Sequence, residues 1–499
     1  METHDGRILA MLGFGFDSRV RIGPCPAFQA DWQAVRGRRG YKWPHPRSYH
    51  CAWKASDHPR SFVGRTNFTK GQAYMSTITE TATPTQASEM LRRARRVLPG
   101  GVLASYVMPS AVETVISHGD GARVFDVDGK SYIDYILGSG PMIVGHAHPK
   151  VTEAINEQAR RGTQYYTLSE TTIELAERLV EAIPCAEQVK LTSSGAEATF
   201  YAMRVARAAT GCDKILKFKG AYHGHHDYAM TGSGMSTAGT PAAVEQTLVT
   251  ATYNDIEGTL TAIEENAADL AAVIVEPVQR STPPRPGFLQ ALREATSRHR
   301  IVLIFDEMVT GFRVHLEGGQ GLYGVTPDLA TYGKAIGGGL PLAALAGTEA
   351  LMDHLNPRRT DKSAYVYMSG TLNGNPLAAA AGIATLDILQ APGAFEQLEN
   401  VSRRLRQGLE DVLTKADVPA HVLGEGAMAS VLFADGDPFH PATAAASDRA
   451  LRSRLDALMI ERGILVNLPA KFYVSTAHQD SDVDEAIAAF GDSLAEAVK

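Results

Sequence analysis

Four short apolar runs alternate with helical patterns through the middle of this chain. The runs cover residues 189–191, 215–218, 272–275 and 302–305, and apolar side chains at helical spacing fill residues 195–209 between the first two. Strands that alternate with helices form parallel sheets, because each helix returns the chain to the edge where the previous strand began. We therefore expect an α/β fold whose parallel sheet is covered on both faces.

The chain on either side of this region has a different character. Residues 1–74 contain all three tryptophans and 12 Lys and Arg against 5 Asp and Glu, without a helical or strand period. We expect them to be a non-core extension upstream of a natural start at Met75; the alternative is a basic targeting or binding arm. Residues 75–135 are expected to contribute to a small domain, residues 136–390 to form a large domain, and residues 391–499 to form the C-terminal small α+β domain.

Charge and cysteine content exclude several classes of protein. The net charge of −7 over 499 residues gives no reason to expect nucleic acid or an anionic membrane as a partner. The four cysteines show neither CxxC spacing nor a disulfide framework, which is typical of a reducing cytosol. No apolar stretch approaches the roughly 18 residues that span a bilayer. We therefore expect a cytoplasmic protein.

Asp306 and Lys334 are the most informative pair of residues in the sequence. Asp306 follows the apolar run at 302–305, so it is expected at the carboxyl end of a strand, where open α/β sheets bind ligands. Lys334 precedes the glycines at 337–339, which let the backbone pass close to a bulky ring. Alone, the aspartate is most simply a helix cap or surface ion pair, and the lysine a solvated charge. Together they match the requirements of a pyridoxal phosphate site. A lysine holds this cofactor as a Schiff base, and a carboxylate keeps its ring nitrogen protonated.

The segment Ser194-Gly195-Ala196 is a candidate phosphate site. It stands where a strand passes into the helix expected at 195–209. The N–H groups and the dipole of a helix N-terminus attract phosphate, although a plain serine cap explains the same residues. Only the combination with Asp306 and Lys334 favours phosphate here.

Three further residues are candidates for the same site. Tyr222 offers an aromatic ring that can stack on the pyridine. Glu276 is a second carboxylate at a strand end, and Thr371 lies in a glycine-rich turn ahead of a helix, where it is a possible phosphate contact.

The segment around His223 also raises the possibility of a metal site. It holds His223, His225, His226 and Asp227 within five positions. A helix with paired histidines and a carboxylate, or a matched distant cluster, would be needed to support a metal, and neither is visible. We expect no metal site.

Six motifs occur in order between about residue 86 and the C-terminus. They are LPGG at 98–101, DVDGKSYIDY at 126–135, GPMIVGHAHP at 140–149, SSGAEAT at 193–199, KFKGAYHGHHD at 217–227 and SGTLNGNPLAAAAG at 369–382. In these motifs the chain resembles the class III, or omega-type, aminotransferases, in the branch that contains glutamate-1-semialdehyde aminomutase. The resemblance implies fold type I, with a mixed, mostly parallel central sheet in the large domain and a smaller α+β domain.

The resemblance also implies roles for individual residues. Lys334 would be the Schiff-base lysine and Asp306 the partner of the pyridine nitrogen, both catalytic. The other cofactor contacts within one subunit would be Ser194, Gly195, Ala196, Tyr222, His223 and Glu276. Thr371 would reach the phosphate of the neighbouring subunit, which makes a homodimer the active unit.

The substrate end departs from the aminomutase pattern. Aminomutases read roughly VNSPVR after the LPGG motif, whereas residues 102–107 read VLASYV and lack the arginine. The usual Gly-Asn behind Glu276 is Arg280-Ser281, and residues 469–475 are shorter and lack a glutamate. The candidate partners for a substrate carboxylate are Arg280, Arg285, Arg313 and Lys471.

We therefore predict an aminotransferase that depends on pyridoxal 5'-phosphate. It would move an amino group from an amino acid or amine to a keto acid or aldehyde, with Lys334 as the base for a 1,3-proton shift. The alternatives on the same scaffold are an aminomutase and a racemase. A non-catalytic binding protein is a further alternative, which the retained Asp306 and Lys334 oppose.

Overall fold

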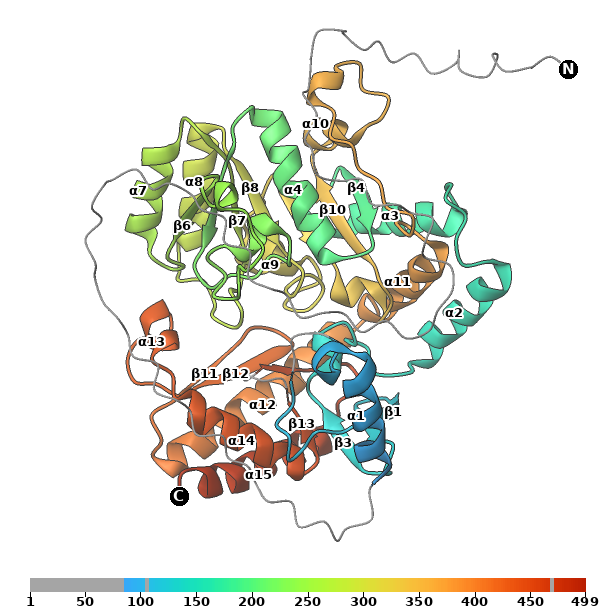
Figure 1. The fold of residues 1–499 in the computed structure, drawn as a ribbon, viewed down its shortest axis with the longest axis vertical. Helices are drawn as coiled ribbons and strands as arrows, with labels where there is room; N and C mark the ends of the chain where they lie inside the picture. Colours follow the sequence, from blue (N-terminus) through green and yellow to red (C-terminus); the bar gives the residue numbers. More distant parts are fainter. Residues whose placement is uncertain (1–84, 104–106, 467–470) are drawn as a thin grey trace, which may run out of the picture. The chain divides into compact units, whose positions relative to one another are not determined.

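A seven-stranded sheet forms the centre of the computed structural model, which describes residues 85–103, 107–466 and 471–499 (Figure 1). In order across the sheet, its strands are β4 (Gln188–Thr192), β10 (Ala343–Gly347), β9 (Leu329–Tyr332), β8 (Val302–Asp306), β7 (Leu270–Val275), β5 (Lys214–Phe218) and β6 (Leu248–Ala251). All neighbours are parallel except β10, which runs antiparallel to both β4 and β9. Each predicted apolar run lies within one of these strands, and the predicted mixed, mostly parallel sheet is confirmed.

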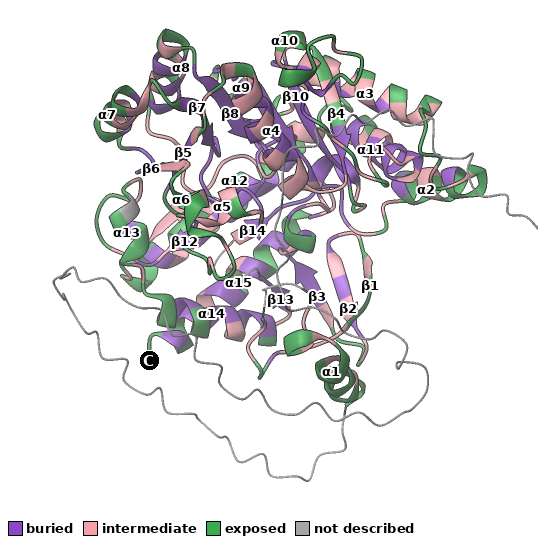
Figure 2. Ribbon diagram, turned by 45° about the horizontal axis from the view of Figure 1, so that its top comes forward, coloured by how far each residue is buried: buried purple, intermediate pink, exposed green. Residues whose placement is uncertain are grey.

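Alternate side chains of the central strands enter different hydrophobic cores. On β8, Val302 and Ile304 pack into one cluster, whereas Leu303 and Phe305 pack into another. The first cluster is completed by α4 (Gly195–Thr210), and the second includes side chains of α8 (Phe288–His299). Figure 2 shows these strands buried between partly exposed helices. Because both faces are covered, every position of β8 before Asp306 is apolar.

The helices around the central sheet follow the predicted alternation. The helix expected at 195–209 is α4, which Ser194 caps at its start and Gly211 ends with φ 71°. The other helices of this region are α2 (Pro149–Arg161), α3 (Glu170–Ala182), α5 (Asp227–Met230), α6 (Ala242–Glu245), α7 (Ile256–Asn266), α9 (Gly318–Tyr323), α10 (Glu349–Met352) and α11 (Pro376–Leu389).

The described chain also forms two smaller sheets, the first of which combines N-terminal and C-terminal segments. One holds β1 (Ile116–Asp120), β2 (Arg123–Asp126), β3 (Ser131–Asp134) and β13 (Ile464–Leu465); the other holds β11 (His421–Leu423), β12 (Met428–Leu432) and β14 (Lys471–Tyr473). The associated helices are α1 (Gln86–Val97), α12 (Ala394–Ala416), α13 (Pro441–Ala445), α14 (Arg449–Glu461) and α15 (Asp480–Ala497). Because β13 pairs with β3 in parallel, segments from both ends of the chain share one sheet. The domain boundaries stay predictions, and the proposed extension at 1–74 lies outside the described residues.

No single helix in the described ranges is long and apolar enough to cross a membrane. α11 and α12 reach the required length and hydropathy only as a pair, and the pair is bent by 77°.

Candidate active site

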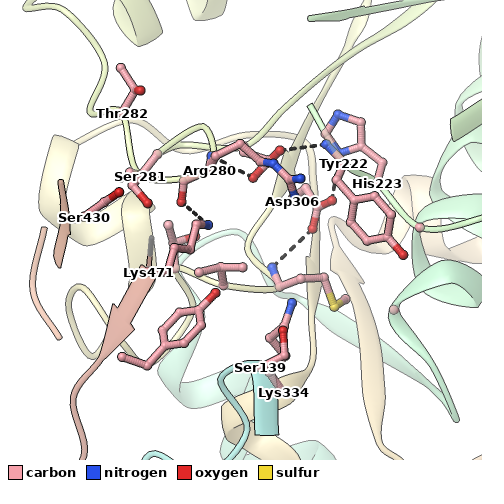
Figure 3. A pocket seen from close by; sticks show the side chains of 18 of the residues that line it. Ser139, Tyr222, His223, Arg280, Ser281, Thr282, Asp306, Lys334, Ser430 and Lys471 are labelled. Atoms are coloured by element: carbon pink, nitrogen blue, oxygen red, sulfur yellow. Dashed lines mark hydrogen bonds and ion pairs between the residues drawn. The ribbon is translucent and has the colours of Figure 1, made fainter. Parts of the chain in front are cut away.

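One edge of the central sheet gathers the predicted acidic and basic groups. β7, β8 and β9 are parallel neighbours, and their carboxyl ends lead to Glu276, Asp306 and Lys334. All three residues line a cavity of about 610 Å³ (Figure 3). Its wall also includes Ser194, Gly195, Ala196, Tyr222, His223, Arg280, Ser281, Met308, Ser430, Lys471 and Tyr473.

The carboxylate of Asp306 is held from both of its oxygens. It is only 3% exposed, and its Oδ2 lies 2.7 Å from Nδ1 of His223. Its Oδ1 accepts hydrogen bonds from Oγ1 of Thr331 at 3.1 Å and from the backbone N–H of Met308 at 3.2 Å. An ionised carboxylate can only accept, so Nδ1 of His223 carries the shared proton. These bonds fix the position of the negative charge in the cavity wall.

Lys334 brings an amine with an altered proton affinity to the same cavity. It begins a short 3₁₀ turn, Lys334–Gly337, and its φ of 46° is unusual for a residue with a Cβ. Burial lowers the pKa of its amino group, and the carboxylates of Asp306 and Glu276 only partly oppose this effect. This shift makes the neutral amine, the form that attacks an aldehyde, more accessible than in a free lysine.

The N-terminus of α4 forms another wall of the cavity. Oγ of Ser194 accepts a hydrogen bond from the backbone N–H of Glu197 at 3.3 Å, so the serine is a helix cap as well as a lining residue. A Cβ on Gly195 would lie 2.7 Å from Sδ of Met308, and a Cβ on Gly224 would lie 2.7 Å from Cα of Ala196. The loop that follows Tyr222 therefore passes directly over the helix start, beside the N–H groups that have no partner inside the helix.

Glu276 ties two loops of the cavity together. It is 6% exposed, and its Oε1 accepts a hydrogen bond from the backbone N–H of Tyr222 at 2.9 Å. Its Oε2 accepts another from the backbone N–H of Arg280 at 3.1 Å. Both oxygens are thus engaged by main chain, so the carboxylate orders the residues on either side of the cavity.

The residues that line the cavity match the chemical groups of pyridoxal phosphate. The N-terminus of α4 would hold the phosphate, Asp306 would pair with the protonated ring nitrogen, and Lys334 would hold the aldehyde carbon. Nε2 of His223 is buried and has no hydrogen-bond partner among the described residues, so it can accept a bond from a polar ligand.

Most of the residues predicted for the cofactor come together here. The cavity contains Ser194, Gly195, Ala196, Tyr222, His223, Glu276, Asp306 and Lys334. Thr371 does not line it; this residue is exposed, and its carbonyl accepts a hydrogen bond from the side chain of Gln164. Within the described ranges, no three His, Cys, Asp or Glu side chains form a cluster that could hold a metal ion.

The four candidate partners for a substrate carboxylate separate into two groups. Arg280 and Lys471 line the cavity. Arg313 does not: it is 1% exposed, and its guanidinium donates to the carbonyls of residues 140, 427 and 474. Arg285 pairs with Asp437 away from the cavity. Residues 104–106 and 467–470, which include part of the departures from the aminomutase pattern, lie outside the described residues.

The sequence did not predict two residues that donate hydrogen bonds to Asp306, which are Thr331 and Met308. Thr331 stands opposite Asp306 in the β8–β9 register, and Met308 follows two residues later. A polar residue inside the otherwise apolar strand β9 was the available signal for Thr331. Its partner could be named only once β9 was known to lie beside β8.

Comparisons with known proteins agree with this geometry. The family model for class-III aminotransferases matches residues 106–475. Glutamate-1-semialdehyde 2,1-aminomutase 2 of Brevibacillus brevis strain 47 is 42% identical over 431 residues, which are 83% of this chain and 99% of that protein. An omega-transaminase from Sphaerobacter thermophilus superposes with a TM-score of 0.80 and 35% identity, over 83% of this chain and 98% of that one. A transaminase solved with pyridoxal phosphate bound has a TM-score of 0.76 and 32% identity, over 82% and 97% of the two chains.

These matches extend over most of the described chain and include every strand of the central sheet. They also agree with the fit of the cavity to the cofactor. The chain therefore belongs to the class-III aminotransferase family and is an enzyme of fold type I with pyridoxal phosphate as its cofactor.

Proposed function

We propose that this enzyme is an aminotransferase, which moves an amino group from an amino acid or amine to a keto acid or aldehyde. One observation carries the proposal: Arg280, Ser281 and Lys471 line the same cavity as Lys334 and Asp306. The residues expected at the cofactor match the family, whereas 280–281 and 469–475 depart from the aminomutase pattern. Changes confined to the substrate end favour the family's chemistry on a different amine.

The residues of the cavity can divide the reaction between them. When bound, pyridoxal phosphate supplies an electron sink for the charge that develops on the carbon beside the substrate nitrogen. Asp306, held by His223 and Thr331, places a fixed negative charge for the ring nitrogen. Lys334 would hold the aldehyde carbon of the cofactor, and its amino group, whose pKa burial lowers, could take a proton from one carbon and return it to another.

An aminomutase is the second candidate, and the names of the curated relatives favour it. Relatives that are 40–42% identical over most of their length are named glutamate-1-semialdehyde 2,1-aminomutase. An aminomutase would use the same cofactor and the same lysine, but it would move the amino group within one molecule. The two candidates therefore differ in their products rather than in Lys334 or Asp306.

A half-reaction with a single substrate separates the candidates. The holoenzyme is mixed with one amino donor and no acceptor, and product and cofactor absorbance are followed together. We expect one equivalent of carbonyl product per subunit and conversion of the cofactor to its amine form. Isomerisation of glutamate 1-semialdehyde, with the cofactor returned to the lysine, would instead establish the aminomutase. A panel of donors with pyruvate and 2-oxoglutarate then identifies the acceptor.

We further propose that the active unit is a homodimer in which Thr371 completes the phosphate site of the neighbouring subunit. Thr371 is exposed and outside its own cavity, as such a role requires. Tyr166 and Leu168 are 73% and 81% exposed, and they line a hollow of about 1220 Å³ with residues 368–370. Large apolar side chains exposed beside a hollow are typical of a protein interface.

The dimer is tested by introducing a charge at its proposed interface. Leu168→Asp is expected to give monomers in light scattering and to weaken cofactor binding, because each phosphate site would lose its partner. Val498→Asp changes an exposed apolar residue near the C-terminus and serves as the control. Monomeric wild-type protein with full cofactor affinity would contradict the proposal, and so would unchanged affinity in Thr371→Val.

A further inference from the structure

The cavity is lined by two cationic residues, Arg280 and Lys471, that the cofactor contacts do not use. Figure 3 shows Lys471, Ser281 and Ser430 on the side of the cavity away from Tyr222 and His223. Nζ of Lys471 donates a hydrogen bond to the backbone carbonyl of Arg280, so the two cationic residues are neighbours although they are 191 positions apart.

Neither cation has an acidic partner among the residues that the structure describes. The guanidinium of Arg280 lies 5.6 Å from the centre of the Tyr222 ring and forms no ion pair with a described residue. The nearby carboxylates are already engaged: Glu276 accepts two backbone N–H groups, and Asp306 accepts bonds from three donors. No carboxylate of the described residues is therefore paired with either cation, although the charge of Glu276 still acts on Lys471.

The surroundings of Lys471 change its affinity for a proton. Burial and the nearby Arg280 and Lys334 lower the pKa of its amino group to about 7, although Glu276 opposes them. A negatively charged ligand would favour the protonated amine in this position. Ser281 supplies a second polar group: it is 6% exposed, and its Oγ has no hydrogen-bond partner among the described residues.

The backbone at Arg280 is also held in an unfavourable conformation. Its φ is 61°, in the left-handed region that glycine adopts readily and other residues avoid. An arginine kept where glycine is less strained indicates that its side chain has a use, because strained residues concentrate at functional sites.

We propose that Arg280, Lys471 and Ser281 bind the carboxylate of the substrate, so that this enzyme acts on amino acids and keto acids rather than on plain amines. The inference rests on the proposed aminotransferase function and deepens it by naming the substrate class. A guanidinium and an ammonium both pair with carboxylate, and a serine hydroxyl can donate a further bond. The amino donor and the keto acid both carry this group, so one subsite serves both halves of the reaction.

Two variants test the subsite with little disturbance of the backbone. Arg280→Gly removes the guanidinium, relieves the left-handed strain, and keeps both the N–H that binds Glu276 and the carbonyl that binds Lys471. Lys471→Gln removes the other charge. Arg285→Gln is the matched control, because Arg285 pairs with Asp437 outside the cavity.

Paired substrates measure the contribution of the carboxylate itself. Glycine, β-alanine and 4-aminobutanoate are compared with methylamine, ethylamine and propylamine, which lack only the carboxylate. We expect the wild type to prefer the carboxylate-bearing member of the pair it uses best. Arg280→Gly and Lys471→Gln should each lower that preference, measured as the kcat/KM ratio of the acid to its matching amine, about tenfold, the loss of one hydrogen bond to a charged group. Arg285→Gln should leave the preference unchanged, and Arg280→Gly should not lower Tm.

Binding of butanoate to the holoenzyme provides a readout that needs no turnover. Calorimetry should show butanoate bound by the wild type and by Arg285→Gln, with about tenfold weaker binding in the two cavity variants. If butanoate binds in this way but no amino group is transferred, the aminotransferase proposal fails and the subsite stands. Equal binding by all four proteins, or no binding by the wild type, overturns the subsite.

Discussion

Replacing Lys334 with alanine is expected to abolish turnover and the covalent attachment of the cofactor. The loss should be roughly 10⁴-fold or more, because the variant lacks both the amine that holds the aldehyde and the base that moves the proton. Reduction with borohydride followed by peptide mass spectrometry should label Lys334 in the wild type and leave the variant unlabelled.

A second lysine in the cavity makes this experiment more stringent. Lys471 lines the same cavity, and its pKa is lowered to about 7, so it also offers a neutral amine near physiological pH. We expect it to remain unlabelled, because it lies beside Arg280 rather than beside Asp306. Lys471→Gln should therefore keep the attached cofactor. Labelling of Lys471 in the wild type, or full activity of Lys334→Ala, would contradict the assignment of Lys334. A non-catalytic binding protein, in contrast, would still bind its ligand when Lys334 is replaced by alanine.

Much of the site could be predicted because its residues follow the ends of parallel strands. Glu276 and Asp306 each come directly after an apolar run, and parallel neighbours end at the same edge of the sheet. The position of Ser194 is predictable for the same reason, because Ser194 lies where strand β4 leads into helix α4. The sequence order of strand, polar residue and helix is enough to place these groups near one another before any coordinates are known.

The parts that could not be predicted depend on which strands become neighbours. β10, with the sequence AALAG, has little intrinsic strand preference, and only its packing between β4 and β9 makes it a strand. Thr331 meets Asp306 for the same reason, through the register of β8 and β9. The meeting of Arg280 with Lys471 requires a loop after β7 to approach β14, a contact that no local pattern encodes.

Replacing Asp306 with asparagine is expected to remove most of the activity while the fold is kept. The amide has nearly the same shape, and its oxygen can still accept bonds from Thr331 and the N–H of Met308. His223 can change its tautomer, since its Nε2 has no partner among the described residues that would oppose a proton there. What the variant loses is the negative charge that keeps the pyridine nitrogen protonated. We expect kcat to fall about 10²- to 10³-fold, the cost usually found when one preorganised electrostatic contact is removed.

Asp328→Asn is the matched control for this change, because Asp328 also accepts a backbone bond within the same sheet. Its Oδ2 accepts from the N–H of Leu303 at 2.7 Å and pairs with Arg293, but it precedes β9 and does not line the cavity. If the role of Asp306 were only structural, the two variants would lower Tm and activity in proportion. If Asp306 acts on the cofactor, Asp306→Asn alone should change the pH dependence of the cofactor absorbance, because the protonation of the ring nitrogen depends on that carboxylate. Wild-type turnover in Asp306→Asn, or the same absorbance profile in both variants, would show that the charge beside His223 has no electronic role.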